Sequence, residues 1–353
     1  MNKTPISGQI APETTDETVL DVRELTTELQ TRDGVLRAVD NVSFTVRAGE
    51  VVGVVGESGC GKSMTAQSVL GLLPPSGKIV AGSVKLAGRE LVGLKPAELR
   101  RARLRGLAVV FQDPMTSLNP VHKVGAQVAE AARIHLGLSR QDAKRAALEA
   151  LERVHIPSAA RRFNDYPHQL SGGMRQRVVI AMAMVTQPKV LIADEPTTAL
   201  DVTTEAKILD GLEELRSATN MGVLLVTHDI GMISSRADRL VVMYAGRIVE
   251  QGVTAEVIAR PRHPYTAALI ESVLTPETPH RSILPAISGS PPDLRRRFTA
   301  CRFAERCGRV EDRCRDGDPA LVPIENEQRW VACVRPLSGS QNPATVLKDS
   351  THA

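Results

Sequence analysis

The sequence has few aromatic residues and no long apolar run, and both absences exclude classes of protein. Aromatic side chains make up 3% of the 353 residues, whereas proteins that bind single-stranded nucleic acid need them as stacking platforms. No apolar run approaches the roughly 18 residues that a membrane-spanning helix requires, and the densest stretch, VVIAMAMV, is far too short. The net charge of +4 is mild, without a long basic arm. We therefore expect neither a nucleic-acid partner nor a membrane span.

The N-terminus lacks the features of an export signal. Residues 1–18 have no basic start and no apolar core, and they are rich in Thr, Pro and Glu. We expect a disordered leader there and a chain that stays in the cytoplasm. Because thiols are kept reduced in that compartment, a disulfide framework is the least favoured interpretation of the cysteines.

What the sequence does contain is an alternation of strand-like and helix-like segments. Short β-branched runs predict strands at residues 19–25, 38–46 and 50–56, and a helical segment follows and stops at Pro74. Further strands and helices alternate after residue 178, in KVLIAD, residues 203–217, GVLLVTHD and the hairpin RLVVMYAGRIVEQG. This order predicts a mainly parallel sheet covered on both faces. The mostly helical stretch at residues 113–175, with Ser139 as an N-cap, predicts an inserted subdomain.

The C-terminal part of the chain has a different composition. After Pro261 the periodicity fades and Pro, Arg and Cys become frequent, which indicates an appended extension over residues 261–338. Residues 339–353 are polar, and we expect them to be disordered. No internal repeat is visible, so residues 19–260 form one copy of the main domain.

The segment GESGCGKS carries a strong chemical signal. It follows the strand EVVGVV, opens a helix and fits the pattern G-x-x-x-x-G-K-[ST] in the context that this pattern requires. Backbone N–H groups there would surround a phosphate, Lys62 would reach the β- and γ-phosphates, and Ser63 would bind Mg²⁺. The expected nucleotide-binding residues are Gly56, Glu57, Ser58, Gly59, Cys60, Gly61, Lys62 and Ser63. The alternative is a glycine-rich turn without a ligand. Cys60 is interpreted as a small filler rather than a reactive thiol.

A second signal follows an apolar strand. The stretch KVLIADEP places Asp194 at the end of the strand, beside the expected Mg²⁺ site, and Glu195 one residue further on. A carboxylate at the second position can polarise an attacking water. Alone, such a pair is weak evidence for a nucleotide site, since acidic residues often cap the next turn. Together with the phosphate loop, the pair is strong evidence.

A third motif, LSGGMRQR at residues 170–177, is a Ser-Gly-Gly turn that opens a helix. Helix N-termini bind anions, yet one nucleotide has a single γ-phosphate, which the first loop already holds. The motif makes sense if it caps a nucleotide that a partner subunit binds. An ordinary capped helix start is the alternative.

Together these motifs resemble those of the nucleotide-binding subunits of ABC transporters. GESGCGKS corresponds to Walker A, LSGGMRQR to the signature and VLIADEP to Walker B. Gln112 in VVFQDP matches the Q-loop, Asp201 in TALD ends the D-loop, and His228 in LLVTHD is the switch histidine. The resemblance spans about residues 19–260 and its ordered set is highly specific. Met174 and Ala199 differ from the commonest residues at their positions, but neither supplies a required side chain to phosphate.

The resemblance implies a P-loop NTPase fold of the ABC type, with an α/β core, an inserted helical subdomain and a cysteine-containing extension. It implies ATP hydrolysis with catalytic roles for Glu195, His228 and Gln112. The implied Mg²⁺ ligands are Ser63, Gln112 and Asp194. Two such domains would face head to tail, so that each ATP lies between one Walker A and the other subunit's signature. The residues expected to contact nucleotide from the signature and D-loop are Ser171, Gly172, Gly173 and Asp201.

Within that family, the chain resembles the ATPases of the oligopeptide/dipeptide importer group, which also transports nickel and glutathione. The stretches that carry this resemblance are FQDPMTSLNP, YPHQLSGGMRQR, MYAGRIVEQG and RHPYTAALIESV. It implies a second ATPase subunit, two permease subunits, a solute-binding protein, and a place on the cytoplasmic face of the bacterial inner membrane. Residues 113–125 would receive a permease helix. One departure is Leu29, where the family usually has an aromatic residue that stacks on adenine.

Two rival functions remain open at this point. A soluble ABC ATPase that acts on DNA or ribosomes usually has long coiled coils or a duplicated domain, and this chain has neither. An ATP-dependent iron–sulfur carrier would explain a phosphate loop plus cysteines. It would need neither LSGGMRQR nor a switch histidine.

Four of the five cysteines, Cys301, Cys307, Cys314 and Cys333, lie in the extension. Zinc sites favour cysteine pairs two to four residues apart, and the wider spacing here suits a [4Fe–4S] cluster with four thiolate ligands. We therefore expect a cluster with a structural role, with zinc or free thiols as alternatives. The neighbouring arginines either offset the cluster's charge or form solvated surface: Arg295, Arg296, Arg297, Arg302, Arg306, Arg309, Arg313 and Arg315.

Overall fold

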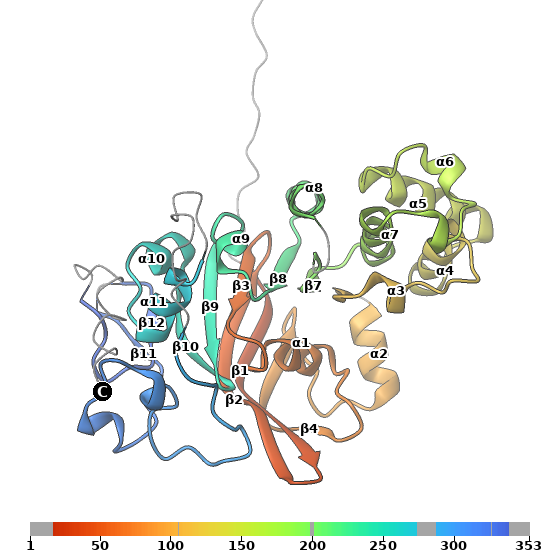
Figure 1. Ribbon diagram of the computed structural model, residues 1–353. Helices are drawn as coiled ribbons and strands as arrows, with labels where there is room; N and C mark the ends of the chain where they lie inside the picture. Colours follow the sequence, from red (N-terminus) through yellow and green to blue (C-terminus); the bar gives the residue numbers. More distant parts are fainter. Residues whose placement is uncertain (1–16, 105, 198–200, 274–286, 326, 339–353) are drawn as a thin grey trace, which may run out of the picture.

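The structure is a computed structural model that describes residues 17–104, 106–197, 201–273, 287–325 and 327–338. Apart from residues 17 and 18, the expected disordered leader and tail lie outside the described residues. The described strands form two sheets (Figure 1).

The smaller sheet is antiparallel, with strand order β2-β1-β4-β5. Its long hairpin pairs β1 (Thr18–Thr31) with β2 (Gly34–Arg47), and β4 (Gly77–Leu86) and β5 (Arg89–Glu90) complete it. The sequence predicted the first two strands but not their pairing, because a mainly parallel sheet was expected. The hairpin forms since only the short turn at residues 32–33 separates two strands with buried alternate positions.

The larger sheet has the order β11-β12-β10-β9-β3-β8-β7-β6, and its centre is parallel as predicted. The parallel strands are β3 (Val51–Val55), β6 (Leu107–Val110), β7 (Val190–Asp194), β8 (Gly222–Val226) and β9 (Arg239–Tyr244). Every residue of β3, β7 and β8 is buried, as expected for Val- and Leu-rich strands covered on both faces. The predicted hairpin continues from β9 into β10 (Arg247–Val253).

Helices cover the sheets and form a separate lobe, which lies at the right of Figure 1. The lobe contains α3 (Pro114–Ser117), α4 (Val124–Leu136), α5 (Arg140–Arg153), α6 (Ala159–Arg162), a 3₁₀ turn (Pro167–Gln169) and α7 (Gly172–Met184). Ser139 caps α5 as predicted, because its hydroxyl accepts a hydrogen bond from the N–H of Asp142 at 3.2 Å. The helices outside the lobe are α1 (Lys62–Leu70), α2 (Pro96–Leu104), α8 (Val202–Thr219), α9 (Ile230–Ser234), α10 (Thr254–Ala259) and α11 (Pro264–Glu271).

The C-terminal extension packs into the main domain. Its strand β12 (Trp330–Val331) pairs with β10, and β11 (Val322–Pro323) pairs with β12. Phe303 is 4% exposed and belongs to the hydrophobic core that also contains strands of the larger sheet. Within the described residues, no helix is long and apolar enough to span a membrane.

Candidate functional site

The phosphate loop connects the end of β3 to the start of α1, as the sequence predicted. Gly56, Gly59 and Gly61 all have positive φ angles, of 153°, 77° and 105°. A Cβ atom on Gly61 would lie 2.4 Å from the carbonyl oxygen of Ala38. Only glycine therefore fits at Gly61, because both the backbone conformation and the space exclude a side chain.

Lys62 lies across this loop and is 5% exposed. Its Nζ donates hydrogen bonds to the carbonyl oxygens of Gly56 at 2.7 Å and Glu57 at 3.1 Å. An ammonium group held inside the curve of a glycine-rich loop is placed to bind a phosphate. Cys60 is buried, and burial raises the pKa of its thiol, which is consistent with a filler and not with a reactive thiolate.

Ser63 and Asp194 meet at the first turn of α1 and the end of β7. The Ser63 hydroxyl donates to Oδ1 of Asp194 at 3.0 Å. Burial raises the pKa of Asp194 above its ordinary value. A hydroxyl and a carboxylate oxygen at this distance are the hard ligands that Mg²⁺ prefers, so the residues present fit the expected ion.

Glu195 joins the two other residues that were predicted to be catalytic. Its Oε2 accepts a hydrogen bond from Nε2 of Gln112 at 3.2 Å, and its Oε1 lies 3.2 Å from Nδ1 of His228. Glu195 has a positive φ of 47° and donates its N–H to the carbonyl oxygen of Val226 at 2.8 Å. Strand ends that are distant in the sequence thus bring an amide, a carboxylate and an imidazole together next to Asp194.

The signature motif lies in the helical lobe, apart from α1 (Figure 1). Ser171 caps α7 by accepting a hydrogen bond from the N–H of Met174 at 3.3 Å. A Cβ on Gly173 would lie 2.5 Å from Cγ2 of Thr204, so this glycine packs closely against the first turn of α8. Asp201 caps that helix and is exposed. The signature thus packs on the start of α8, just after Asp201, and lies apart from the phosphate loop of the same chain. Ala199 lies outside the described residues.

Leu29, at the position expected to stack on adenine, lies in β1 opposite Leu36 and Gly77. A Cβ atom on Gly77 would lie 3.0 Å from Cδ2 of Leu29. The leucine thus packs on the start of β4 and offers an apolar surface in place of an aromatic ring.

The four cysteines of the extension line one narrow cavity, together with His263 and Phe303. Among the described residues, no group of three or more His, Cys, Asp or Glu side chains is arranged to hold a metal ion. The structure therefore does not support the expected cluster. Burial raises the pKa of Cys301 to about 11 and that of Cys333 to about 12, so these thiols are protonated at neutral pH.

Two arginines of the extension have partners that the sequence did not predict. Arg302 forms ion pairs with Asp40 and Asp318, and Arg306 forms one with Glu57 of the phosphate loop. The side chains of Arg302 and Arg306 are 7% and 3% exposed. Neither arginine is solvated surface, and the carboxylates already balance the charges that were expected to face the cysteines. Tyr265, whose hydroxyl accepts from the N–H of Glu57 at 2.8 Å, was also missed.

Comparisons with known proteins identify the family. Residues 39–198 match the ABC transporter family, and residues 249–314 match the C-terminal region of oligopeptide/dipeptide transporters. A probable peptide ABC transporter ATP-binding protein of Sinorhizobium fredii is 49% identical over 87% of this chain and 92% of its own length. A putative peptide import ATP-binding protein of Brucella ovis is 45% identical over 90% of this chain and 97% of its own length.

Solved structures agree on the fold. A dimeric ATP-binding cassette in a post-hydrolysis state, bound to ADP and Pi, is 28% identical with a TM-score of 0.60, covering 67% of this chain and 98% of that one. The cbiO1 protein of Clostridium perfringens, part of an ABC transporter complex, is 30% identical with a TM-score of 0.60, covering 69% of this chain and 91% of that one. The chain therefore belongs to the ABC transporter family, as an ATP-hydrolysing subunit that carries the C-terminal region of oligopeptide/dipeptide transporters.

Proposed function

We propose that this subunit powers the import of peptides or related small solutes through a membrane transporter. The observation that carries the proposal is the meeting of Gln112, Glu195 and His228 beside the Ser63–Asp194 pair. The matched C-terminal region and the names of the relatives favour peptides as the transported class. In the part of the chain that the structure describes, nothing favours a soluble ATPase or an iron–sulfur carrier over import.

The chain's own residues divide the chemistry among them. The loop amides and Lys62 bind the phosphates, while Ser63, Asp194 and the amide oxygen of Gln112 would hold Mg²⁺, which neutralises charge on the β- and γ-phosphates. Glu195 accepts a proton from the attacking water, and His228 holds the carboxylate and contacts the γ-phosphate. Ser63 already contacts Asp194, and Glu195 already contacts both Gln112 and His228, so each of these two sets is arranged before ATP and water bind.

The signature lies apart from the phosphate loop of its own chain, so it can bind a nucleotide only in a second ATPase subunit. Because α7 lies apart from α1 in the same chain, Ser171, Gly172 and Gly173 reach a nucleotide only in a second ATPase subunit. A head-to-tail pair of this chain, or of this chain and a paralogue, forms two such sites. The pair would act on the cytoplasmic face of the inner membrane with two permease subunits and a solute-binding protein.

The test is transport by the assembled complex. Purified permeases, this subunit and its ATPase partner are placed in vesicles with the solute-binding protein, and uptake of labelled peptides is measured with and without ATP. We expect ATP-dependent uptake that Lys62→Ala abolishes. Uptake that does not need ATP, or a complex that fails to form with any permease, would contradict the proposal.

We also infer that the extension holds a [4Fe–4S] cluster with a structural role. The inference rests on the donor set, since four sulfurs from distant sequence positions line one cavity. Although they are not arranged around a single ion, a cluster spreads its ligands more widely than one ion does. Because burial raises the pKa of the Cys301, Cys307 and Cys333 thiols, binding would release protons.

A further inference from the structure

The side chain of Glu57, in the first half of the phosphate loop, is bound by the C-terminal extension. Nη1 of Arg306 lies 2.7 Å from Oε2 of Glu57, and Nη2 lies 2.9 Å from Oε1. This is a bidentate pair between residues 249 positions apart. The arginine side chain is 3% exposed and the glutamate side chain 24%, so the interaction is partly shielded from solvent.

Arg306 is itself held in one orientation. It donates hydrogen bonds to the carbonyl oxygens of Ser288 at 2.8 Å and Ile287 at 3.1 Å, and to the Tyr244 hydroxyl at 3.2 Å. Its guanidinium also lies 5.7 Å from the centre of the Tyr244 ring. An arginine fixed by this many partners sets the position of the carboxylate that it binds.

The backbone of Glu57 is fixed from the same side. Its N–H donates to the Tyr265 hydroxyl at 2.8 Å, and its carbonyl oxygen accepts from Lys62. The rings of Tyr244, Tyr265 and Phe303 pack against one another, with centroids 4.6 to 5.5 Å apart. Two of the three tyrosines in the chain therefore support this one loop residue, Tyr265 directly and Tyr244 through Arg306. Because the carbonyl oxygen of Glu57 binds Lys62, the position of Glu57 also affects that of Lys62.

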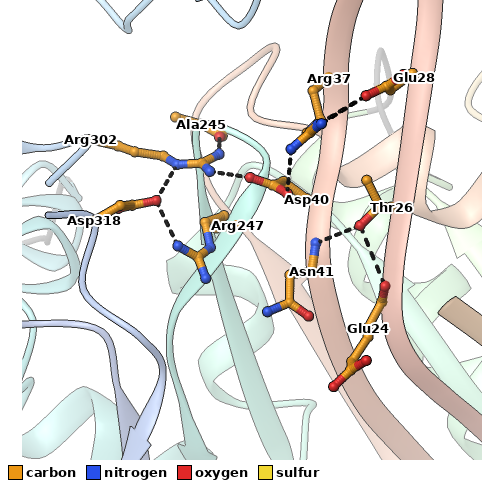
Figure 2. A network of polar contacts seen from close by, with 10 residues as sticks. All are labelled: Glu24, Thr26, Glu28, Arg37, Asp40, Asn41, Ala245, Arg247, Arg302 and Asp318. Carbon is orange, nitrogen blue, oxygen red and sulfur yellow. Dashed lines mark hydrogen bonds and ion pairs between the residues drawn. The ribbon is translucent and has the colours of Figure 1, made fainter. Parts of the chain in front are cut away.

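A second arginine of the extension, Arg302, contacts β2, the strand that packs against the second half of the phosphate loop (Figure 2). Arg302 contacts Asp40 of β2, the carbonyl oxygen of Ala245 at 2.5 Å and Asp318, which also binds Arg247. Ala38 lies two residues before Asp40 on β2, and its carbonyl oxygen lies against Gly61 of the phosphate loop. The extension thus supports the loop from two directions.

These contacts come from one short segment that has a cysteine at each end. Cys301 and Cys307 flank Arg302, Phe303 and Arg306, and both cysteines line the cavity described above together with Phe303. The N–H of Cys301 also donates to the carbonyl oxygen of Cys314 at 2.9 Å. The fold of the cysteine region therefore determines where the two arginines lie.

We propose that Arg306 is a positioning residue for the phosphate loop, through which nucleotide affinity depends on the folded state of the cysteine-bearing extension. The proposal rests on ATP binding at this loop and goes beyond it by assigning the loop's position to a segment outside the ATPase core. Removing Arg306, the buried member of this ion pair, leaves the partly exposed carboxylate of Glu57 unpaired. In Arg306→Gln, Glu57 is then expected to turn toward solvent and to draw the loop away from Lys62.

The experiment measures equilibrium binding of MgADP and of a fluorescent ATP analogue to the full-length chain. We expect Arg306→Gln to raise both dissociation constants about tenfold, which corresponds to about 1.4 kcal/mol, while kcat at saturating ATP changes less than KM. The double variant with Glu57→Gln should bind like the single variants, since the two residues act as a pair. Arg313→Gln is the matched control, because Arg313 lies in the same extension, is 68% exposed and pairs only with nearby Glu311 among the contacts seen.

Tyr265→Phe keeps the proposal testable if Arg306→Gln does not fold. This change removes the acceptor for the Glu57 N–H but keeps the ring packing, and we expect about threefold weaker binding at a nearly unchanged Tm. Folded variants that bind nucleotide like the wild type, or additive effects of Arg306→Gln and Glu57→Gln, would overturn the inference. A wild-type chain that bound no nucleotide would instead remove the proposed function on which the inference rests.

Discussion

At the scale of single residues, the site depends on side chains at the ends of neighbouring strands. Asp194 and Glu195 follow β7, and His228 follows β8, which is paired with β7 in parallel. The family resemblance predicted that these groups act together, and the pairing explains why they meet, because parallel strands end at the same edge of a sheet. Arg306 and Tyr265 could not be predicted in this way, since they lie 249 and 208 positions from Glu57 and no motif marks them.

The first prediction concerns Glu195. In the assembled transporter, Glu195→Gln should bind ATP but lose about a hundredfold or more of its turnover, because an amide cannot accept the proton from water. ATPase activity and trapped nucleotide are the measurements. Glu214→Gln, at an exposed carboxylate on α8, is the control and should be normal. Near-normal hydrolysis by Glu195→Gln would refute the assigned role, whereas lost ATP binding would indicate damage to the Mg²⁺ site.

At the scale of elements, β3 packs so closely against α9 that there is no room for a side chain at Gly53. A Cβ on Gly53, in the middle of β3, would lie 2.4 Å from Cδ1 of Ile233 on α9. Gly211, within α8, has no atom within 4 Å of the same position. One glycine therefore lies in a tightly packed place and the other has open space beside it, and the sequence alone does not reveal this difference.

These surroundings predict opposite stability changes for one substitution. Gly53→Ala should lower the free energy of unfolding by about 1–3 kcal/mol through overpacking. Gly211→Ala should raise it by about 0.5–1 kcal/mol, because alanine is the better helix former. Denaturant unfolding of both variants gives the comparison, and equal changes in the two would show that the packing at Gly53 is looser than described.

The connection between α3 and α4 is an exposed element with a fixed shape. The buried Gln127 accepts from the N–H of Asn119 at 2.9 Å and donates to the carbonyl oxygens of Asn119 and His122 at 3.0 and 2.9 Å. Val121 is 75% exposed on the loop that these bonds hold. An apolar side chain presented on a rigid loop suits contact with a partner.

We therefore predict that residues 113–125 contact a permease subunit. A photo-cross-linking residue at Val121 should capture permease in the assembled transporter. The same residue at Arg145, which is exposed on α5, should not. Equal yields from both positions, or capture from neither with reagents that work elsewhere in the complex, would count against this contact.

At the scale of the whole molecule, the cassette was predictable and the integration of the extension was not. Walker A, signature and Walker B specified the parallel core because each motif requires a particular strand and helix around it. The extension has little periodicity of its own, since it takes much of its order from the core through Phe303, β12 and the two arginines. Contacts of that kind leave no local pattern in the sequence.

The cysteine cavity gives a prediction for the whole chain. Protein purified without oxygen should be brown and contain about four irons. Removal of the iron should lower the Tm, because the proposed cluster would link segments from residue 301 to residue 333. Colourless protein with one zinc would show a tetrahedral ion site, and metal-free protein with four titratable thiols would reject both.

The pairing of β12 with β10 has a consequence for solubility. Without the extension, β10 would be a seven-residue edge strand with unpaired backbone groups, open to pairing with another chain. Among the described residues, β12 instead pairs with Glu250 and Gln251 of β10, and the outermost strand at this edge is β11, which has only two residues, one of them Pro323. Proline cannot donate to a further ladder. The extension thus ends the sheet in a form that does not template aggregation, a protective property separate from any contribution to ATP binding.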